Sequence, residues 1–256
     1  MRAVVVGASS GLGRCIGVGL GRRGARVALL ARRRERLEAA AAEAGPGALP
    51  IECDVTEPAS VASAIGKAAA DLGGIDALVY TPAIGPLARL VDTDLDRWRR
   101  LFDTNVIGAA LVTNAVIPHL TESHGTALYL SSVSASLTSP WPGLGAYAVS
   151  KAALKKLVEA LRVEHPSIGF TCCTVGDCTG GEGDSMSGFP TASGWDMDLA
   201  AELFPVWQAR GLLAGCFIDA EDLVNAVDAL LRSGPSLSTP SITIAPRPPT
   251  TQKETP

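Results

Sequence analysis

Tyr147 and Lys151 stand four residues apart in the segment Tyr-Ala-Val-Ser-Lys, near the start of a predicted helix. Residues at positions i and i+4 share one helix face, so the two side chains are expected side by side. A free tyrosine has a pKa of about 10 and is a poor acid or base at neutral pH. A neighbouring ammonium favours the phenolate and moves this pKa toward the working range. The pair therefore predicts proton transfer at the tyrosine hydroxyl.

A glycine-rich turn runs from Gly7 to Gly13, between the first predicted strand and the helix that follows it. Glycine permits the tight turn and lets the backbone approach a ligand closely, while the helix start offers N–H groups and a positive dipole end to phosphates. Three glycines at this spacing occur by chance, but the position between strand and helix indicates a dinucleotide site. The residues expected to hold the cofactor here are Gly7, Ser9, Ser10, Gly11, Leu12 and Gly13.

Two strand ends indicate how the adenosine half of such a cofactor is held. Arg32 follows the second strand, where an acidic residue would bind the ribose 2′-hydroxyl; arginine instead pairs with a 2′-phosphate, which favours NADP over NAD. The two arginines after Arg32 are expected to open a solvated helix. Asp54, followed by Val55 at the end of the third strand, either accepts a hydrogen bond from the adenine amino group or caps the next helix.

Short apolar runs alternate with amphipathic segments along the chain. The predicted strands are Val4–Val6, Val27–Leu30, Leu49–Cys53, Ala77–Tyr80, Ala127–Leu130, Phe170–Val175 and Ile242–Ala245. The predicted helices are Leu12–Arg23, Arg33–Ala44, Pro58–Leu72, Asp94–Leu120, Ala146–Glu164 and Ala220–Arg232. This alternation predicts an α/β fold, a doubly wound parallel sheet of about seven strands with helices on both faces. The continuously apolar strands agree, because such a sheet is buried on both sides.

Composition narrows the function classes. The 256 residues suffice for one domain, expected over residues 1–245, with a polar tail over 246–256 that we expect to be disordered. A net charge of -4 gives no reason to expect a nucleic acid or an anionic membrane as partner. Neither a signal peptide nor an apolar stretch of about 20 residues is evident, which favours a cytoplasmic protein. The six scattered cysteines are expected to be reduced core residues, and no metal site is expected.

With Asn105 and the strand end Ser131-Ser132, these motifs resemble the short-chain dehydrogenase/reductase (SDR) family over about residues 2 to 175. The resemblance implies a single-domain Rossmann-type fold. It also implies an NADP(H)-dependent oxidoreductase that interconverts a carbonyl and a secondary alcohol by hydride transfer. Its substrate would be a small molecule, and its assembly a homodimer or homotetramer.

The resemblance also implies roles for four side chains. Tyr147 would be the general acid in reduction and the base in oxidation, and Lys151 would hold the nicotinamide ribose and lower the tyrosine pKa. Ser132 would bind the substrate carbonyl, and Asn105 would hold a water that links Lys151 to solvent. Ser134 is the alternative to Ser132, because it has the family's usual spacing to Tyr147, whereas Ser132 directly ends the strand.

Two segments depart from the family pattern. Tyr80-Thr81-Pro82-Ala83 stands where the family has Asn-Asn-Ala-Gly beside the cofactor; Thr81 supplies a hydroxyl there, but Pro82 has no N–H. Gly176-Asp177 replaces a Pro-Gly turn that lies against the nicotinamide in the family. The departures motivate an alternative function, an NADP(H)-binding sensor or scaffold protein with little turnover.

Residues 176–218 interrupt the strand–helix alternation and predict a substrate lid, with an ordinary surface loop as the alternative. Four aromatic residues of this segment suggest an apolar underside and a hydrophobic substrate: Phe189, Trp195, Phe204 and Trp207. In an oligomer, the helices Asp94–Leu120 and Ala146–Glu164 would pack across a two-fold axis. Their apolar residues available for core or interface are Val112, Val116, Leu154, Leu157 and Leu161.

Overall fold

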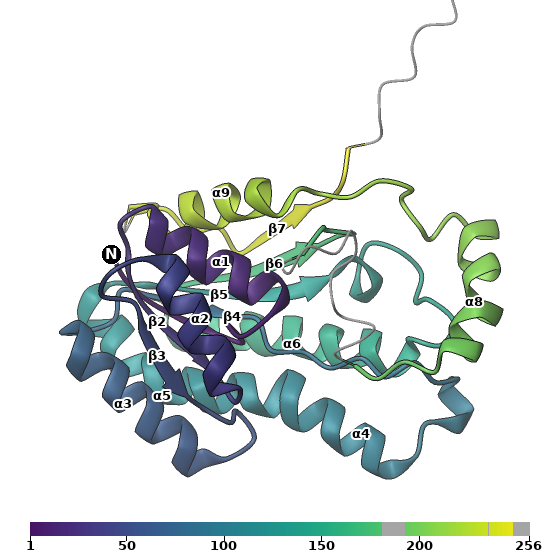
Figure 1. Cartoon of the computed structure of the whole chain (residues 1–256), viewed down its shortest axis with the longest axis horizontal. Coiled ribbons are helices and arrows are strands. Elements are labelled where there is room, and N and C mark those ends of the chain that lie inside the picture. The colour runs from purple at the N-terminus through teal and green to yellow at the C-terminus, as the bar shows by residue number, and fades with distance from the viewer. Residues whose placement is uncertain (181–192, 235, 248–256) are drawn as a thin grey trace, which may run out of the picture.

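The computed structural model describes residues 1–180, 193–234 and 236–247, and its centre is one seven-stranded parallel sheet (Figure 1). The strands are β1 (Arg2–Val6), β2 (Arg26–Ala31), β3 (Leu49–Glu52), β4 (Ala77–Tyr80), β5 (Thr126–Ser132), β6 (Gly169–Val175) and β7 (Ser241–Ile244). The spatial order is β3-β2-β1-β4-β5-β6-β7. The predicted fold class and all seven predicted strands are confirmed.

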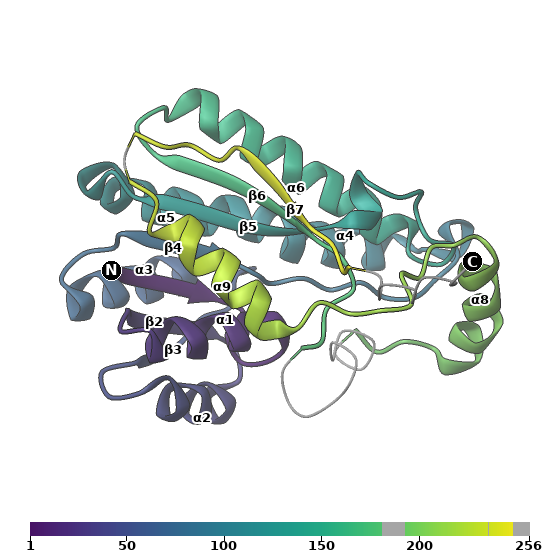
Figure 2. The same cartoon turned by 90° about the horizontal axis from the view of Figure 1, so that it is seen from above.

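Helices cover both faces of the sheet, as Figures 1 and 2 show. They are α1 (Gly11–Arg22), α2 (Arg34–Ala44), α3 (Pro58–Leu72), α4 (Leu95–Phe102), α5 (Gly108–Ser123), α6 (Gly145–Glu164), α8 (Met197–Ala209) and α9 (Ala220–Leu231). Successive strand residues point to opposite faces. Val4 and Val6 accordingly pack with α3, α5 and α6, whereas Ala3 and Val5 pack with α1, α2 and α9.

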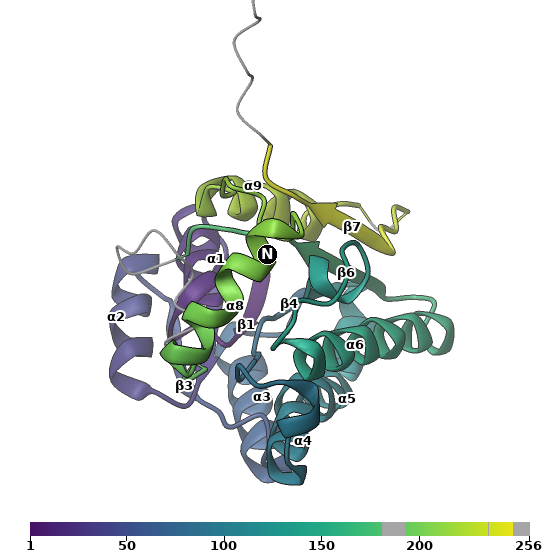
Figure 3. The same cartoon turned by 90° about the vertical axis from the view of Figure 1, so that its right-hand side faces the viewer.

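The strand order reverses direction at β1, which pairs with β2 on one side and β4 on the other. Loops that leave β1 and β4 therefore diverge to opposite faces of the sheet and open a crevice between them. In doubly wound sheets, ligands bind in this crevice, outside the carboxyl ends of the strands. The carboxyl ends point toward α8, which Figure 3 shows in front of the sheet edge.

The segment predicted as one helix, Asp94–Leu120, is interrupted. Between α4 and α5 lies a π-helical turn, Asp103–Ile107, in which the Gly108 N–H reaches back to the Asp103 carbonyl. Such turns are frequent at functional sites because they displace backbone groups from the regular ladder. Within this turn, the Thr104 carbonyl accepts a hydrogen bond from the Tyr80 phenol at 2.6 Å.

Within the described residues, one helix, Leu95–Ser123, is long and apolar enough to cross a membrane. Its inward residues Leu101, Val112 and Val116 are fully buried in the protein core, which accounts for this composition. Of the five apolar helix residues named for core or interface, Leu157 is partly buried. The others, Val112, Val116, Leu154 and Leu161, are buried in the chain's own core. Packing of these helices across a two-fold axis stays a prediction.

Helix α8 was not among the predicted helices. Asp196 caps it by accepting from the N–H groups of Asp198 and Leu199 at 3.0 and 3.2 Å. Pro205 lies inside the helix and obscures its pattern in the sequence. Part of the predicted lid is thus a helix, while residues 181–192 lie outside the described residues.

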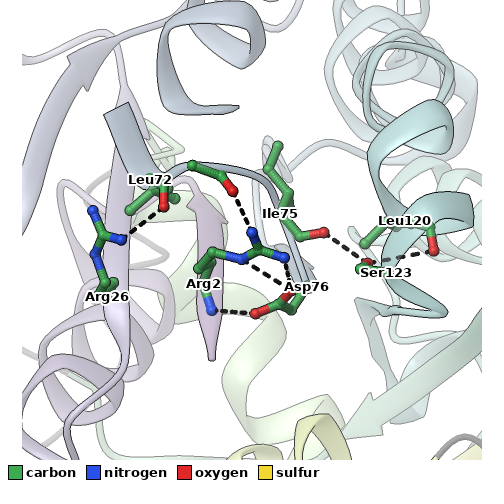
Figure 4. A network of polar contacts seen from close by, with 8 residues as sticks. Arg2, Arg26, Leu72, Ile75, Asp76, Leu120 and Ser123 are labelled. Carbon is green, nitrogen blue, oxygen red and sulfur yellow. Dashed lines mark hydrogen bonds and ion pairs between the residues drawn. The ribbon is translucent and has the colours of Figure 1, made fainter. Parts of the chain in front are cut away.

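The amino edge of the sheet, opposite the crevice, is tied by charged hydrogen bonds (Figure 4). Arg2 at the start of β1 donates its N–H and Nε to the Asp76 carboxylate at 2.8 and 3.0 Å. Arg26 of β2 donates to the Leu72 carbonyl at the end of α3, at 2.8 Å. The Ser123 hydroxyl donates to the Ile75 carbonyl at 2.8 Å. These bonds join β1, β2, α3 and α5 at one edge.

We expect Asp76→Asn to lower the free energy of unfolding by about 1–2 kcal/mol, because charged hydrogen bonds are lost at a partly exposed site. The bond from Arg2 lowers the pKa of Asp76, with burial opposing it. The contribution is thus present above the unfolded-state pKa, about 3.9, and is lost as the pH falls through the folded-state value. Urea unfolding at several pH values measures it. Asp71→Asn, which breaks an exposed pair with Lys67, is the control and should cost less than about 0.5 kcal/mol.

Candidate functional site

A cavity of about 670 Å³ opens at the carboxyl edge of the sheet, where the loops after β1, β4, β5 and β6 meet helix α6. This volume is typical of small-molecule sites. All residues predicted to bind the cofactor line it: Gly7, Ser9, Ser10, Gly11, Leu12, Gly13, Arg32, Asp54, Val55, Thr81, Tyr147 and Lys151. Ser132 and Ser134 line it too, whereas Asn105 lies behind its wall, fully buried.

The glycine-rich turn has no room for side chains at two positions. Gly7 has a φ of +83°, and a Cβ on Gly13 would lie 2.3 Å from Thr81 Oγ1 and 2.5 Å from the Gly7 carbonyl oxygen. Thr81 occupies this place because its hydroxyl donates to the Val6 carbonyl at 2.7 Å. Thr81 thus holds the loop after β4 against β1. This contact uses the Thr81 hydroxyl and no main-chain N–H of residue 82, so Pro82 is compatible with it.

The first turn of α1 has no side-chain cap. Its N-cap residue, Ser10, makes no hydrogen bond to the helix N–H groups, and no acidic residue lies in the first turn. The positive end of the helix dipole therefore faces the cavity, where it favours an anion such as a pyrophosphate. The turn fits the phosphates of a dinucleotide.

Three arginines, Arg32, Arg33 and Arg36, line the cavity beyond the turn. Arg33 is exposed and opens α2, as expected, but it also contacts the glycine-rich turn. Its Nε and Nη2 donate to the Ser9 hydroxyl at 3.2 and 3.0 Å, and Nη2 also donates to the Ser10 hydroxyl. Arg34 does behave as expected, because it is exposed and pairs with Glu38.

Asp54 forms a local turn rather than a cap on α3. Its Oδ1 accepts from the Thr56 N–H and hydroxyl at 3.0 and 2.8 Å, and the N-cap position belongs to Glu57. Burial pushes the pKa of Asp54 upward, but the two hydrogen bonds from Thr56 outweigh it and lower the pKa. An ionised acceptor therefore lies at the β3 end of the cavity.

Tyr147 and Lys151 share one face of α6, as their spacing predicts. Lys151 Nζ lies 5.9 Å from the centroid of the Tyr147 ring, within range of a cation–π interaction. The lysine is buried and donates to the Leu130 carbonyl of β5 at 2.8 Å. This bond holds α6 against the end of β5, where Ser131 and Ser132 follow.

The electrostatic expectation for this pair is not met. Burial raises the pKa of Tyr147 to about 12, with a hydrogen bond to Ser132 acting in the opposite direction. Burial also lowers the pKa of Lys151 to about 8. In both cases the charged form loses hydration, and this outweighs the attraction that the sequence suggested. At neutral pH the phenol carries its proton and the lysine is largely charged; the raised pKa makes this phenol a weaker acid than free tyrosine, not a stronger one.

The two candidate serines are adjacent. Ser132 Oγ lies 3.0 Å from Ser134 Oγ and accepts from the Ser134 N–H at 3.3 Å. A hydrogen bond between Ser132 and Tyr147 lowers the pKa of that phenol, against the larger effect of burial. This geometry favours Ser132 as the partner of a carbonyl oxygen held by Tyr147, with Ser134 supporting it from behind.

Asn105 binds two other segments through its amide. Its Oδ1 accepts from the Ile84 N–H, and its Nδ2 donates to the Ile84 carbonyl and the Ser150 hydroxyl, all at 2.9 Å. Ser150 in turn donates to the Tyr147 carbonyl at 2.7 Å. The π-turn, the loop after β4 and α6 are therefore joined at one buried amide. Ser150 was not among the predicted site residues, although it stands next to Lys151 in the sequence.

Aromatic side chains form a wall next to Tyr147. Trp141, Trp195 and Phe217 line the cavity, and Trp195 is fixed by a 2.8 Å hydrogen bond to the Gly85 carbonyl. Behind them Trp207 of α8 packs 5.4 Å from Trp141 and 5.8 Å from Trp195, measured between ring centroids. Of the four aromatic residues predicted for the apolar underside, Trp195 lines the cavity, Trp207 is buried behind it and Phe204 is exposed, while Phe189 lies outside the described residues.

Comparison with known proteins places these residues in context. A family model described as short chain dehydrogenase matches residues 1–180. A short chain dehydrogenase of Pseudocercospora fijiensis is 39% identical over 173 residues, 65% of this chain and 55% of the relative. The chain thus spans about half the length of that relative. An 11-beta-hydroxysteroid dehydrogenase A of Arachis hypogaea is 32% identical over 247 residues, 93% of this chain and 67% of the relative.

Solved structures share the whole architecture. A short-chain type dehydrogenase/reductase from Mycobacterium marinum has a TM-score of 0.80 at 27% identity, covering 95% of this chain and 93% of that one. The likeness extends beyond residue 180, to α8, α9 and β7.

We expect Gly13→Ala to weaken NADPH binding at least tenfold, because the new Cβ meets the Gly7 carbonyl and forces the turn to shift. Fluorescence titration measures the affinity, and circular dichroism checks that the sheet persists. Gly66→Ala in α3 is a matched control: nothing lies within 4 Å of its Cβ, so affinity should not change. This control should be more stable by about 0.5–1 kcal/mol. Unchanged NADPH affinity in Gly13→Ala would contradict the assignment of the turn.

Proposed function

The chain belongs to the short chain dehydrogenase family, and we propose that it is an NADP(H)-dependent oxidoreductase that interconverts a carbonyl and a secondary alcohol. One observation carries the proposal: Tyr147 and Lys151 line the same cavity as the uncapped, glycine-rich start of α1. Binding of a dinucleotide alone requires no phenol–ammonium pair, whereas hydride transfer to a carbonyl requires a proton donor beside it.

The residues present fit a nicotinamide dinucleotide. The turn at Gly7–Gly13 and the first turn of α1 would hold its pyrophosphate, and Asp54 would accept from the adenine amino group. Lys151 would hold the ribose next to the nicotinamide. The bound dinucleotide supplies the hydride chemistry.

The protein's own residues would position the substrate carbonyl and protonate its oxygen. Tyr147, whose pKa is raised to about 12, keeps its proton at neutral pH and donates it to a carbonyl oxygen during reduction. Ser132 donates a hydrogen bond to the same oxygen, where negative charge develops. Lys151 stabilises the phenolate that is left behind. In oxidation the same groups act in reverse.

Arg32 and Arg33 support NADP as the preferred cofactor. Both line the end of the cavity at β2, where the one acidic lining residue on the adjacent strand end, Asp54, is already hydrogen-bonded by Thr56. Arginine binds phosphate through paired N–H groups. The Ser9 and Ser10 hydroxyls, which Arg33 contacts, would complete the phosphate site.

The aromatic wall supports a substrate with an apolar body. Trp141 and Trp195 belong to the same apolar cluster as Tyr147, so a carbonyl held by Tyr147 would extend its substituents over them. The Arachis hypogaea relative is named for a hydroxysteroid, a bulky apolar alcohol. For this chain we propose a substrate that is similarly bulky and apolar, without proposing that it is a hydroxysteroid.

Tyr147→Phe tests the function. With NADPH and a panel of apolar ketones, turnover should fall at least 100-fold, because the proton donor is lost, while the Kd for NADPH stays within about threefold. Tyr129→Phe is the matched control, since that phenol is buried in the core against Thr113 and should leave turnover unchanged. If NADPH binds tightly, no ketone is reduced and Tyr147→Phe changes nothing, the protein is a sensor or scaffold instead.

Arginine variants test the cofactor preference. Arg32→Ala and Arg33→Ala should each weaken NADPH binding about tenfold or more and leave NADH binding within about threefold, because only NADPH carries the 2′-phosphate. Arg34→Ala, which removes an exposed arginine paired with Glu38, should change neither affinity. Equal losses for both cofactors would show that the arginines support the turn without reading the phosphate.

A further inference from the structure

Asp177 is a carboxylate with little compensation at the Tyr147 end of the cavity. It is partly buried and lines the cavity. Its one side-chain hydrogen bond is long, 3.3 Å from the Ala214 N–H to Oδ2, and among the described residues no cation pairs with it. Burial accordingly raises the pKa of Asp177. A half-buried negative charge of this kind gains free energy from any cation that enters the cavity.

The position of Asp177 follows from strand register. Val175 of β6 lies beside Ser132 of β5, and Asp177 follows two residues later. Lys151 is anchored on Leu130 of the same β5 strand. Asp177 therefore belongs to the end of the cavity where Ser132 and Tyr147 would hold the carbonyl.

The other acidic residue among the described lining residues, Asp54, follows β3. Five strand spacings separate β3 from β6 in the sheet order, which corresponds to roughly 24 Å. Asp54 also has two good hydrogen bonds from Thr56, so its charge is already compensated. The two carboxylates thus differ in both place and need for a counter-charge.

We propose that Asp177 is the counter-charge for the oxidised nicotinamide ring, so that the site binds NADP⁺ in preference to NADPH. This inference rests on the proposed function. Hydride donation to a carbonyl carbon leaves a cationic pyridinium ring in place of a neutral dihydropyridine, while the Tyr147 proton goes to the oxygen. Hydride transfer needs the reacting atoms within about 3–3.5 Å, so the ring must lie beside the carbonyl that Ser132 and Tyr147 hold. Asp177, in the loop that follows β6, lines this end of the cavity and would stabilise the ring in its charged form only.

A functional consequence follows for the direction of the reaction. Stabilising the cationic ring makes the bound reduced cofactor a stronger hydride donor. The internal equilibrium on the protein then shifts toward alcohol and NADP⁺. Asp177 would thereby favour the direction of carbonyl reduction. Release of the oxidised cofactor would then be slow.

Asp177→Asn tests the proposal, because asparagine keeps an oxygen for the Ala214 N–H and removes only the charge. The Kd values of NADP⁺ and NADPH are measured by calorimetry at pH 7.5. We expect NADP⁺ to bind roughly tenfold more weakly and NADPH to change by less than about threefold. Asp177→Glu should retain most of the preference. Asp54→Asn is the matched control, and it should alter both affinities by the same factor.

Several outcomes would overturn the inference. A parallel change of both affinities, or of neither, would show that Asp177 does not sense the ring; with a lowered Tm, its role would be to hold the segment at Ala214. An unchanged affinity ratio together with a raised KM for a ketone bearing an ammonium group, relative to its neutral counterpart, would assign the carboxylate to the substrate. Failure of the wild-type protein to bind either dinucleotide would instead refute the proposed function itself.

Discussion

The hydrogen bond from Lys151 to the Leu130 carbonyl fixes the geometry on which the site depends. A buried ammonium is costly unless an acceptor meets it, and here the acceptor is the main chain of β5. The bond sets the distance between α6 and the end of the strand, and thus between Tyr147 and Ser132. Asn105 secures the other side, because its amide ties α6 to the loop after β4. Helix α6, which carries Tyr147, is therefore held by the main chain of β5 and by the main chain of the loop after β4.

Most of the fold and much of the site could be predicted from the sequence. The strands are short, continuously apolar runs, which identify a parallel sheet buried on both faces. Gly7 to Gly13 stand between a strand and a helix, and Tyr147 and Lys151 stand one helical turn apart; both patterns are local, so they survive folding unchanged. All twelve predicted cofactor residues line one cavity for this reason. Their roles in binding and catalysis remain predictions.

What the sequence could not supply depends on tertiary contacts. The amide of Asn105, in the π-turn, bonds both Ile84 and Ser150, and neither is near it in the chain. The hydrogen bond from Arg33 to Ser9 joins residues 24 positions apart, so it depends on the folded turn and is not evident from the sequence around Arg33. The pKa of Tyr147 moves opposite to expectation because burial, which depends on the whole surrounding fold, outweighs the hydrogen bond with Ser132. Helix α8 contains a proline and owes its place to Trp207 and Leu203 packing beneath it.

The stabilising contacts and the cavity lie at opposite edges of the sheet, and this separation affects which substitutions the chain tolerates. The charged network of Arg2 and Asp76 closes the amino edge, while every group with a chemical task lies one strand length away, roughly 16 Å for the five residues of β1. Substitutions at these distances act almost independently on the free energy of folding. Residues that face the cavity, such as Asp177, can therefore be exchanged one at a time without weakening the amino edge, as long as Thr81 and Ile84 keep their bonds to Val6 and Asn105.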